Sequence, residues 1–283
     1  MTTSLRLGDI TVTALNDGTS HVPPMFYPGL DFTAHPGLLR EDGTYHIPSG
    51  GFLVRGEGFT VLVDAGTGPR SMPFPAELAA AAGLDPAPAS IADGGALPGA
   101  LRAAGVAPED VTTVFLTHLH ADHVGWVAPG GTVYFPRADV VYGAADWDAL
   151  ITPAPADDPA RIVMEGARDA GVLRPVDGAT VRIAPGVVAH HAPGHTPGHY
   201  VVRITAGDQE VCLLGDAVHH PLQLNDTGIS FLFDSDAAQA LRTREDLFVR
   251  LAERDVAVGT AHFPNPHFQR VRGARAERSW TDA

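Results

Sequence analysis

The chain has 283 residues, a formal net charge of −14, no lysine and a single cysteine, Cys212. The absence of lysine excludes Schiff-base catalysis and a Walker-type phosphate loop, and one cysteine excludes an internal disulfide and multi-cysteine metal sites. The acidic balance argues against nucleic acid and membrane partners, and no apolar run is long enough for a span or a secretory signal, so we expect a cytoplasmic protein.

The N-terminal half is predicted to consist mainly of short strands. Alternating apolar residues indicate a strand over residues 10–14, which ends at a hairpin turn signal, Asn-Asp-Gly at residues 16–18. Residues 21–48 are rich in proline, glycine and aromatic residues without periodicity, which predicts a long ordered loop. Further strands are expected at residues 52–54, 60–63, 111–116, 133–135 and 139–142. Helices are expected at residues 76–82, 97–104, 144–150 and 160–170.

The C-terminal half repeats this order of strands and helices. Residues 236–254 form the clearest predicted helix, because apolar residues recur near helical spacing at Ala240, Leu241, Phe248 and Leu251. Strands are expected at residues 180–183, 187–191, 200–204, 210–214 and 256–259. No linker divides the chain, so we expect a single domain over residues 1–283 in which two sheets pack together with helices outside.

Fourteen histidines are the unusual feature of the composition, and they cluster. Residues 118–123 read His-Leu-His-Ala-Asp-His directly after a predicted buried strand. His118 and His120 project to the same side of an extended chain, and the turn that follows can bring Asp122 and His123 to the same space. One such histidine alone could be a core residue, but packing does not explain the group. Imidazole and carboxylate together suit zinc, manganese or iron.

Three later segments place ligand-type side chains just after predicted strands. His195 lies in a glycine-bounded turn, Pro-Gly-His-Thr-Pro-Gly-His, at residues 193–199. Asp216 and His262 each follow an apolar strand. A strand end joins a rigid scaffold to a loop, and side chains there are well placed for binding or catalysis.

In this order, the segments resemble the pattern of the metallo-beta-lactamase-fold metallohydrolases: HxHxDH, a PGHTPGH turn, a Gly-Asp aspartate and a late histidine. The resemblance extends from residue 16 to residue 262. It implies an α+β fold, a four-layer αβ/βα sandwich. It also implies a centre of two divalent metal ions, with zinc expected first and manganese or iron as alternatives.

The resemblance assigns a role to each ligand. The first metal would be held by His118, His120 and His195. The second would be held by Asp122, His123 and His262. Asp216 would bridge the two, since a carboxylate can give one oxygen to each cation. A hydroxide between the metals would attack the substrate, and Asp122 would orient it or accept its proton.

The segment after Asp216 indicates which branch of the family the chain resembles. Lactone-cleaving relatives of the acyl-homoserine lactonase type often carry a tyrosine three residues further on, where this chain has His219. Residues 219–236 are similar to the branch of methyl parathion hydrolase and related lactonases or arylesterases. His219 either donates a hydrogen bond to the leaving oxygen or is structural, and both roles stay open. His199 is expected to brace its loop, and at most one of His190 and His191 to face the site.

Aromatic side chains could form an apolar wall over the metals, or simply be core: Phe26, Tyr27, Trp126 and Phe231. We therefore expect a dinuclear hydrolase of a small ester-like substrate, with lactones or carboxylic esters favoured. Alternatives are a phosphotriesterase or arylesterase, a thioesterase, and a persulfide dioxygenase with one iron. No nucleic acid or membrane partner is expected, and the loop at residues 21–48 could be a lid or a homodimer contact.

Overall fold

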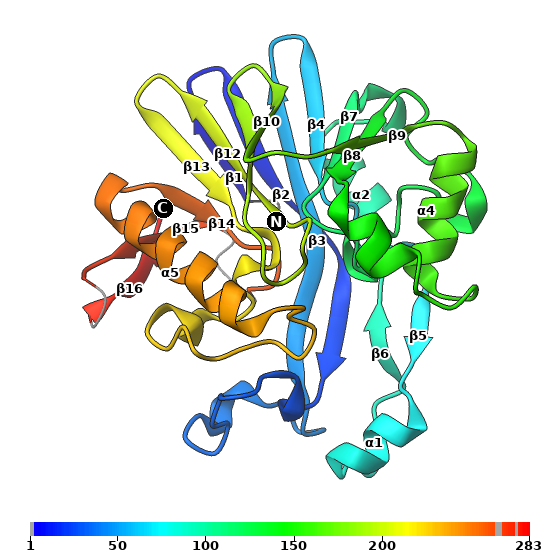
Figure 1. Cartoon of the computed structure of the whole chain (residues 1–283), viewed down its shortest axis with the longest axis vertical. Helices are drawn as coiled ribbons and strands as arrows, with labels where there is room; N and C mark the ends of the chain where they lie inside the picture. The colour runs from blue at the N-terminus through cyan, green and yellow to red at the C-terminus, as the bar shows by residue number, and fades with distance from the viewer. Residues whose placement is uncertain (1–2, 264–267, 275–276) are drawn as a thin grey trace.

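Two mixed β-sheets face each other in the computed structural model, which describes residues 3–263, 268–274 and 277–283 (Figure 1). In these ranges the first sheet has nine strands in the order β5-β6-β2-β3-β4-β7-β8-β9, with β1 paired to β2. Strands β4, β7, β8 and β9 run parallel to one another. The strands are β1 Ser4–Leu7, β2 Ile10–Val22, β3 Tyr45–Gly56, β4 Phe59–Val63, β5 Ser71–Pro73, β6 Ser90–Asp93, β7 Thr113–Leu116, β8 Asp139–Gly143 and β9 Leu173–Val176.

The second sheet follows the chain, from β10 to β16 in order. Its strands pair antiparallel except for β13 and β14, which are parallel. The strands are β10 Thr180–Ala184, β11 Val187–His191, β12 Tyr200–Ala206, β13 Gln209–Leu213, β14 Ala257–Gly259, β15 Phe268–Arg272 and β16 Ser279–Asp282. The crossover between the parallel strands carries the longest helix, α5 Ala237–Arg254.

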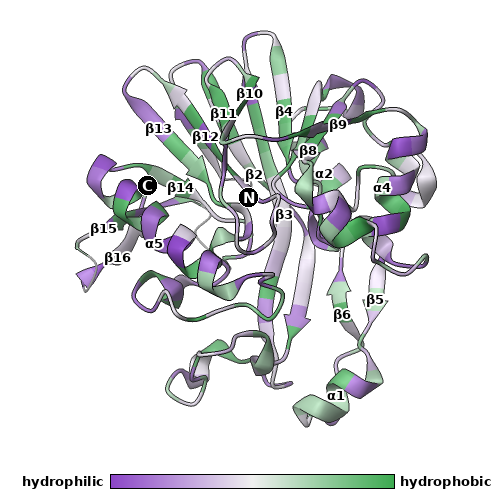
Figure 2. Ribbon diagram, in the orientation of Figure 1, coloured by the Kyte–Doolittle hydropathy of each residue, from purple (hydrophilic) through white to green (hydrophobic). Residues whose placement is uncertain are grey.

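Helices cover the outer face of each sheet. The shorter helices are α1 Ala76–Ala82, α2 Leu97–Ala103, α3 Ala121–Val124 and α4 Pro159–Asp169. Helices α2 and α4 pack their apolar residues on the first sheet, and α5 packs on the second (Figure 1). Figure 2 shows hydrophobic residues concentrated in the strands and hydrophilic residues on much of α5. No helix in the described ranges has both the length and the apolar character needed to cross a membrane.

The inner faces of the two sheets share one apolar core. Val12, Phe52 and Val54 of the first sheet pack there with Val202 and Ile204 of the second, all nearly inaccessible to solvent. The order of layers is therefore helix, sheet, sheet, helix, as expected for an α+β four-layer αβ/βα sandwich.

Strand β2 corrects the predicted hairpin turn. It runs to Val22, and the Asn-Asp-Gly signal forms a bulge against β3, where the register shifts between Asn16 and Gly18. The Asp17 carboxylate is buried, and it accepts hydrogen bonds from the backbone of Gly68 and Leu97, among others. Donors from distant segments thus satisfy the aspartate inside the protein, so no turn forms.

Other expectations were too long, too short or misplaced. The loop predicted at residues 21–48 is shorter, because β2 and β3 extend into it from both sides. Residues 133–135 do not form a strand, and Phe135 packs in the core beneath α4. Strands β1, β5, β6, β9, β15 and β16 were not predicted. Most are three or four residues long, with too few residues for a clear alternation.

Candidate metal centre

The predicted ligands meet at one edge of the sandwich, where strands from both sheets end. His118 and His120 follow β7, and the short helix α3 carries Asp122 and His123. From the second sheet come His195 between β11 and β12, Asp216 after β13 and His262 after β14. The backbone amide of Tyr200 donates to the carbonyl of Thr117 at 2.9 Å, which ties the two sheets together beside this edge.

One trio of histidines lies on the β7 side of the centre. The Nδ1 atom of His120 lies 3.0 Å from Nε2 of His118 and 2.9 Å from Nε2 of His195. These atoms and a carboxylate oxygen of Asp216 all lie within 4.8 Å of one another. This spacing lets one cation contact all four groups.

The second trio consists of Asp122, His123 and His262. The Nε2 atoms of the two histidines are 3.2 Å apart, and Asp122 Oδ2 lies 3.8 Å from that of His123 and 3.7 Å from that of His262. Ligand atoms of this trio also fall within 4.8 Å of one another. A second cation therefore has three candidate ligands here.

Asp216 lies between the trios with one oxygen directed to each. Its Oδ1 atom is 3.2 Å from His123 Nε2 and 3.0 Å from His262 Nε2. Its Oδ2 atom is 3.6 Å from His118 Nε2 and 3.4 Å from His195 Nε2. Among the described residues, buried Oδ1 has no partner with hydrogen-bond geometry. A carboxylate so placed fits a bridge between two cations.

The protonation of the first trio of histidines suits metal binding. Burial lowers the pKa of His120 to about 4 and the pKa of His195 to about 3, and it also holds the pKa of His118 well below the ordinary value. These imidazoles are neutral at pH 7 and keep a lone pair for a metal. Burial also opposes charge on His123 and His262, but Asp216 outweighs it with its neighbouring carboxylates and raises both pKa values.

Comparison with known proteins decides the family. Residues 51–259 match the profile of the Metallo-beta-lactamase superfamily, which is well over half of the chain. The chain belongs to the metallo-beta-lactamase superfamily. The predicted family and fold are thus confirmed.

Curated relatives of this metallo-beta-lactamase superfamily protein match over part of their length. It is 40% identical over 81 residues to "N-acyl homoserine lactonase AiiB" of Agrobacterium fabrum, which is 29% of each chain. It is 31% identical over 134 residues to "Probable metallo-hydrolase Mb2322c" of Mycobacterium bovis, which is 41% of this chain and 40% of that relative. The chain thus spans well under half the length of either relative.

Solved structures match over almost the whole chain. AidC, described as a dizinc quorum-quenching lactonase, has a TM-score of 0.82 at 21% identity, with 100% of this chain and 97% of AidC covered. A probable metal-dependent hydrolase from Staphylococcus aureus has a TM-score of 0.82 at 17% identity, with 99% of both chains covered. At such identities the likeness shows the fold.

The far nitrogens of the candidate histidine ligands contact groups that fix each ring. His123 Nδ1 lies 3.0 Å from Asp64 Oδ2, and His262 Nδ1 lies 2.7 Å from the carbonyl oxygen of Pro48. His195 Nδ1 lies 3.0 Å from Asp234 Oδ1. Such partners orient an imidazole and increase its basicity toward a metal. The sequence analysis did not single out Asp64 or Asp234, and the only available signal for Asp64 was its position at a strand end.

A buried arginine holds the segment that carries Asp234. Arg244 of α5 is 1% exposed, and its guanidinium donates to the carbonyl oxygens of Ala217, Thr227 and Ile229. Its Nη2 atom lies 3.8 Å from Asp234 Oδ2. Burial lowers the pKa of Arg244, and Asp234 acts against that effect. The arginine therefore links α5 to both sides of the loop beside the metal centre.

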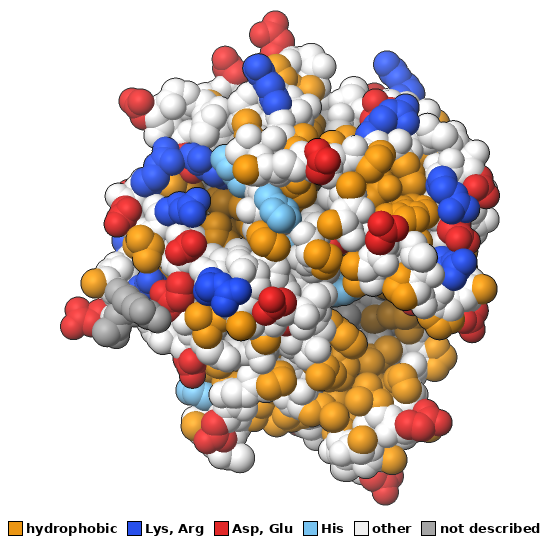
Figure 3. All heavy atoms as spheres, in the orientation of Figure 1, with side chains coloured by type: hydrophobic (Ala, Val, Ile, Leu, Met, Phe, Trp, Pro, Cys, Tyr) orange, Lys and Arg blue, Asp and Glu red, His pale blue; other side chains and the backbone are white. Residues whose placement is uncertain are grey.

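An apolar cavity of about 400 Å³ opens onto the metal centre. Its polar end is formed by His120, Asp122, Asp216, His219 and His262. Its apolar wall includes Val22, Phe26, Ile47, Met72, Ile91, Phe231 and Phe233. Figure 3 shows hydrophobic side chains around a hollow on this face of the molecule. Such a cavity can hold the carbon part of a substrate with its reactive bond at the ligands.

Two of the four predicted aromatic wall residues line this cavity, namely Phe26 and Phe231. Tyr27 lies behind the wall, where its ring contacts Tyr45, and Trp126 is a core residue. The indole Nε1 of Trp126 donates to Asp17 Oδ1 at 2.8 Å, and Trp126 is not among the residues that line the cavity. Phe233 lines the wall instead, and the sequence analysis did not name it.

The other histidines named in the sequence analysis divide between the centre and another surface. His219 Nε2 lies 2.9 Å from Asp216 Oδ2, and its ring stacks on Phe231. His199 accepts from the backbone amide of Asp216 at 3.0 Å, which fits a brace. His190 and His191 lie away from the centre, beside α5.

Proposed function

We propose that this protein is a dinuclear metal-dependent hydrolase that opens lactones or cleaves neutral carboxylic esters with an apolar acyl part. The observation that carries the proposal is the position of Asp216, which directs one oxygen to each of two ligand trios. The apolar cavity beside those trios supports the choice of substrate.

The ligand set fits two zinc ions. His118, His120 and His195 would hold one ion, and Asp122, His123 and His262 would hold the other, with Asp216 shared. Nitrogen and carboxylate donors without a thiolate also accept manganese or iron. When bound, two such cations lower the pKa of water and polarise a carbonyl oxygen.

Two side chains of the cavity are proposed to handle protons and hydrogen bonds. The side chain of Asp122 is 28% exposed, so its carboxylate can accept the proton of the attacking water. The His219 ring is held between Phe231 and Asp216, with Nε2 on the side of Asp216 Oδ2. When a substrate binds, this Nε2–H would be shared between Asp216 Oδ2 and an oxygen of the substrate.

The cavity wall favours a neutral substrate over a charged one. Its described lining contains no arginine, and the chain has no lysine. A substrate with several carboxylates, such as a glutathione thioester, would therefore lack a cationic partner there. Phe26, Phe231 and Phe233 instead offer ring surface to an acyl chain. Relatives named as acyl-homoserine lactonases support the same choice.

Turnover of an acyl-homoserine lactone by zinc-loaded protein tests the proposal, with acid release followed by a pH indicator. Asp122→Asn should lower kcat by about 10²- to 10⁴-fold, the usual contribution of a general base. Exposed Asp208→Asn, at a turn of the second sheet, is the control and should retain full activity. Protein that binds two metal ions yet cleaves neither lactones nor carboxylic esters would refute the proposal. Faster cleavage of a phosphotriester or thioester would favour those alternatives.

A further inference from the structure

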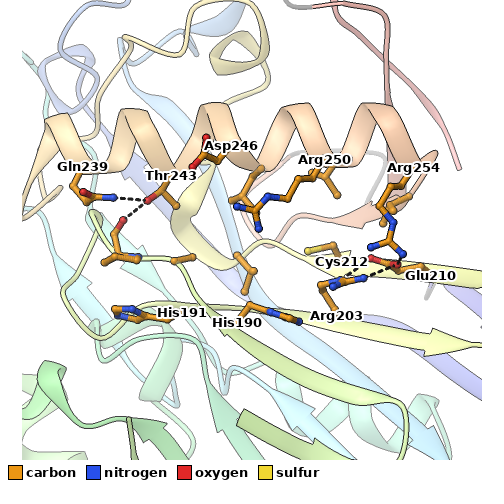
Figure 4. Close-up of a pocket in the computed structure, with 16 residues that line it drawn as sticks. His190, His191, Arg203, Glu210, Cys212, Gln239, Thr243, Asp246, Arg250 and Arg254 are labelled. Atoms are coloured by element: carbon orange, nitrogen blue, oxygen red, sulfur yellow. Dashed lines mark hydrogen bonds and ion pairs between the residues drawn. The ribbon is translucent and has the colours of Figure 1, made fainter. Parts of the chain in front are cut away.

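A second pocket lies between α5 and the outer face of the second sheet, away from the metal centre. It has a volume of about 240 Å³, and none of the proposed metal ligands lines it. Figure 4 shows Arg250 and Arg254 extending from α5, with His190 and Arg203 on the strands beneath. The floor on the strands includes Val201 and Cys212, and Leu251 of α5 adds to the apolar lining. We call this the α5 pocket.

Positive charge exceeds negative charge around the α5 pocket. Glu210 pairs through both oxygens with Arg203, at 2.7 and 2.8 Å, and Oε2 also lies 2.8 Å from Arg254. One carboxylate thus serves two guanidinium groups. Arg250 has no ion pair within 4.0 Å in the described ranges, and Asp246, the other acidic residue of the lining, stays at the level of the helix (Figure 4). A guanidinium next to the pocket is therefore available to a ligand.

The surroundings of His190 show the same excess of positive charge. This histidine is half-buried, and burial, Arg203 and Arg250 together lower its pKa, with Glu210 acting in the opposite direction. Cations at the pocket therefore outweigh the nearby carboxylate. The chain as a whole carries a formal charge of −14, so this local surplus is not an average property of its surface. An anion in the pocket would remove the repulsion.

We propose that the α5 pocket binds a small oxyanion, a phosphate or a carboxylate. Guanidinium groups present paired N–H donors that match the oxygens of both. Arg203 is already fixed by Glu210, so little side-chain freedom is lost when the ligand binds. The apolar floor can take a short carbon chain, and the volume lies below the range of drug-sized sites.

The pocket is suited to binding rather than to covalent chemistry. Cys212 is its only thiol, and it is buried. Burial raises the pKa of Cys212 to about 12, so the sulfur stays protonated and weakly nucleophilic at neutral pH. The ligand is therefore expected to bind and leave unchanged.

Calorimetric titration of the zinc-loaded protein tests the proposal, with inorganic phosphate in one arm and succinate in the other. We expect saturable binding of at least one, weakened about tenfold or more by Arg250→Gln, since that variant loses a charge-assisted contact. Arg102→Gln on α2 is the matched control, an exposed arginine outside the pocket, and should leave binding unchanged. Whichever of phosphate and succinate binds more tightly identifies the kind of oxyanion that the α5 pocket prefers.

The NMR signal of the His190 ring locates the ligand. At an anion concentration that saturates the wild-type protein but not Arg250→Gln, the pKa of His190 should rise in the wild type and rise much less in the variant. Binding that Arg250→Gln leaves unchanged would place the anion at the metal centre and overturn the proposal. The absence of saturable binding in both arms would also overturn it. Circular dichroism of the two variants checks that each is folded.

Discussion

Replacement of Asp234 by asparagine tests whether the metal centre depends on the network behind it. The Asp234 side chain is 1% exposed and accepts from His195 Nδ1 at 3.0 Å and from the backbone amide of Phe231 at 3.0 Å. Burial opposes its ionisation, yet the hydrogen bond from His195 outweighs this with neighbouring charges and lowers the pKa of Asp234. Asparagine keeps an acceptor oxygen but removes the charge that makes His195 a stronger ligand.

The expected size follows from the loss of one such partner. Removing a carboxylate behind a metal-bound histidine typically costs about 10- to 100-fold in metal affinity, or about 1.4 to 2.8 kcal/mol. Asp234→Asn should lower the zinc affinity by about 10-fold and Asp234→Ala by about 100-fold, because alanine also leaves the His195 N–H without an acceptor. The assay is zinc competition against a chromophoric chelator, so no turnover is needed.

The buried Arg244 adds a second expected effect of replacing Asp234, a loss of thermal stability. Without Asp234 its buried guanidinium loses the nearest carboxylate, so thermal unfolding should also begin at lower temperature. Exposed Asp208→Asn provides the control and should change neither quantity. If Asp234→Ala binds both zinc ions as tightly as the wild-type protein does, the network has no role in metal binding.

Three further predictions concern pH, packing and substrate length. Burial raises the pKa of Asp146 from 3.8 to about 6, so the folded state binds the extra proton and the free energy of unfolding should fall by up to about 3 kcal/mol as pH rises from 4 to 7. Urea titrations of Asp146→Asn should lack this fall, and parallel curves would contradict the assignment. Gly194→Ala should cost about 1–3 kcal/mol and release metal, because an added Cβ would lie 2.3 Å from the Ala240 backbone nitrogen. Gly207→Ala, also at a positive φ (58° against 135° at Gly194) but with open space around it, should retain its metal. Met72 lines the cavity, so Met72→Trp should raise KM for substrates with long acyl chains but not for those with short ones. Equal effects on both would show that the acyl chain does not lie against Met72.

The metal centre was the most predictable part of the molecule because its signals are local. His118, His120 and their neighbours fall within six residues, and the later ligands each follow an apolar strand that the sequence makes visible. Helix α5 was equally readable, with predicted bounds of 236–254 against Ala237–Arg254 in the structure. Local periodicity and strand ends therefore predicted the framework of the site.

Features fixed by distant contacts could not be predicted in this way. The bulge at Asp17 depends on donors far along the chain, including Trp126, so its sequence indicates a turn that the fold does not make. Arg244 occupies a position on the buried face of α5 where an apolar residue would be expected from the pattern. Its burial is explained by the carbonyl oxygens of Ala217 and Thr227 and by the nearby Asp234 carboxylate. These groups lie outside α5, so the helical pattern of the sequence does not reveal them.

The start of α5 and the turn that carries His195 form one mechanical unit. The backbone amide of Asp236 donates to the carbonyl oxygen of Gly194, and that of Ser235 donates to the carbonyl oxygen of His195, both at 2.9 Å. The hydroxyl of Thr243 donates to Pro193 at 2.6 Å. A shift of α5 along its axis would therefore also move the His195 imidazole. A force applied at the C-terminal end of α5 would be transmitted to the edge of the sandwich where the two sheets meet.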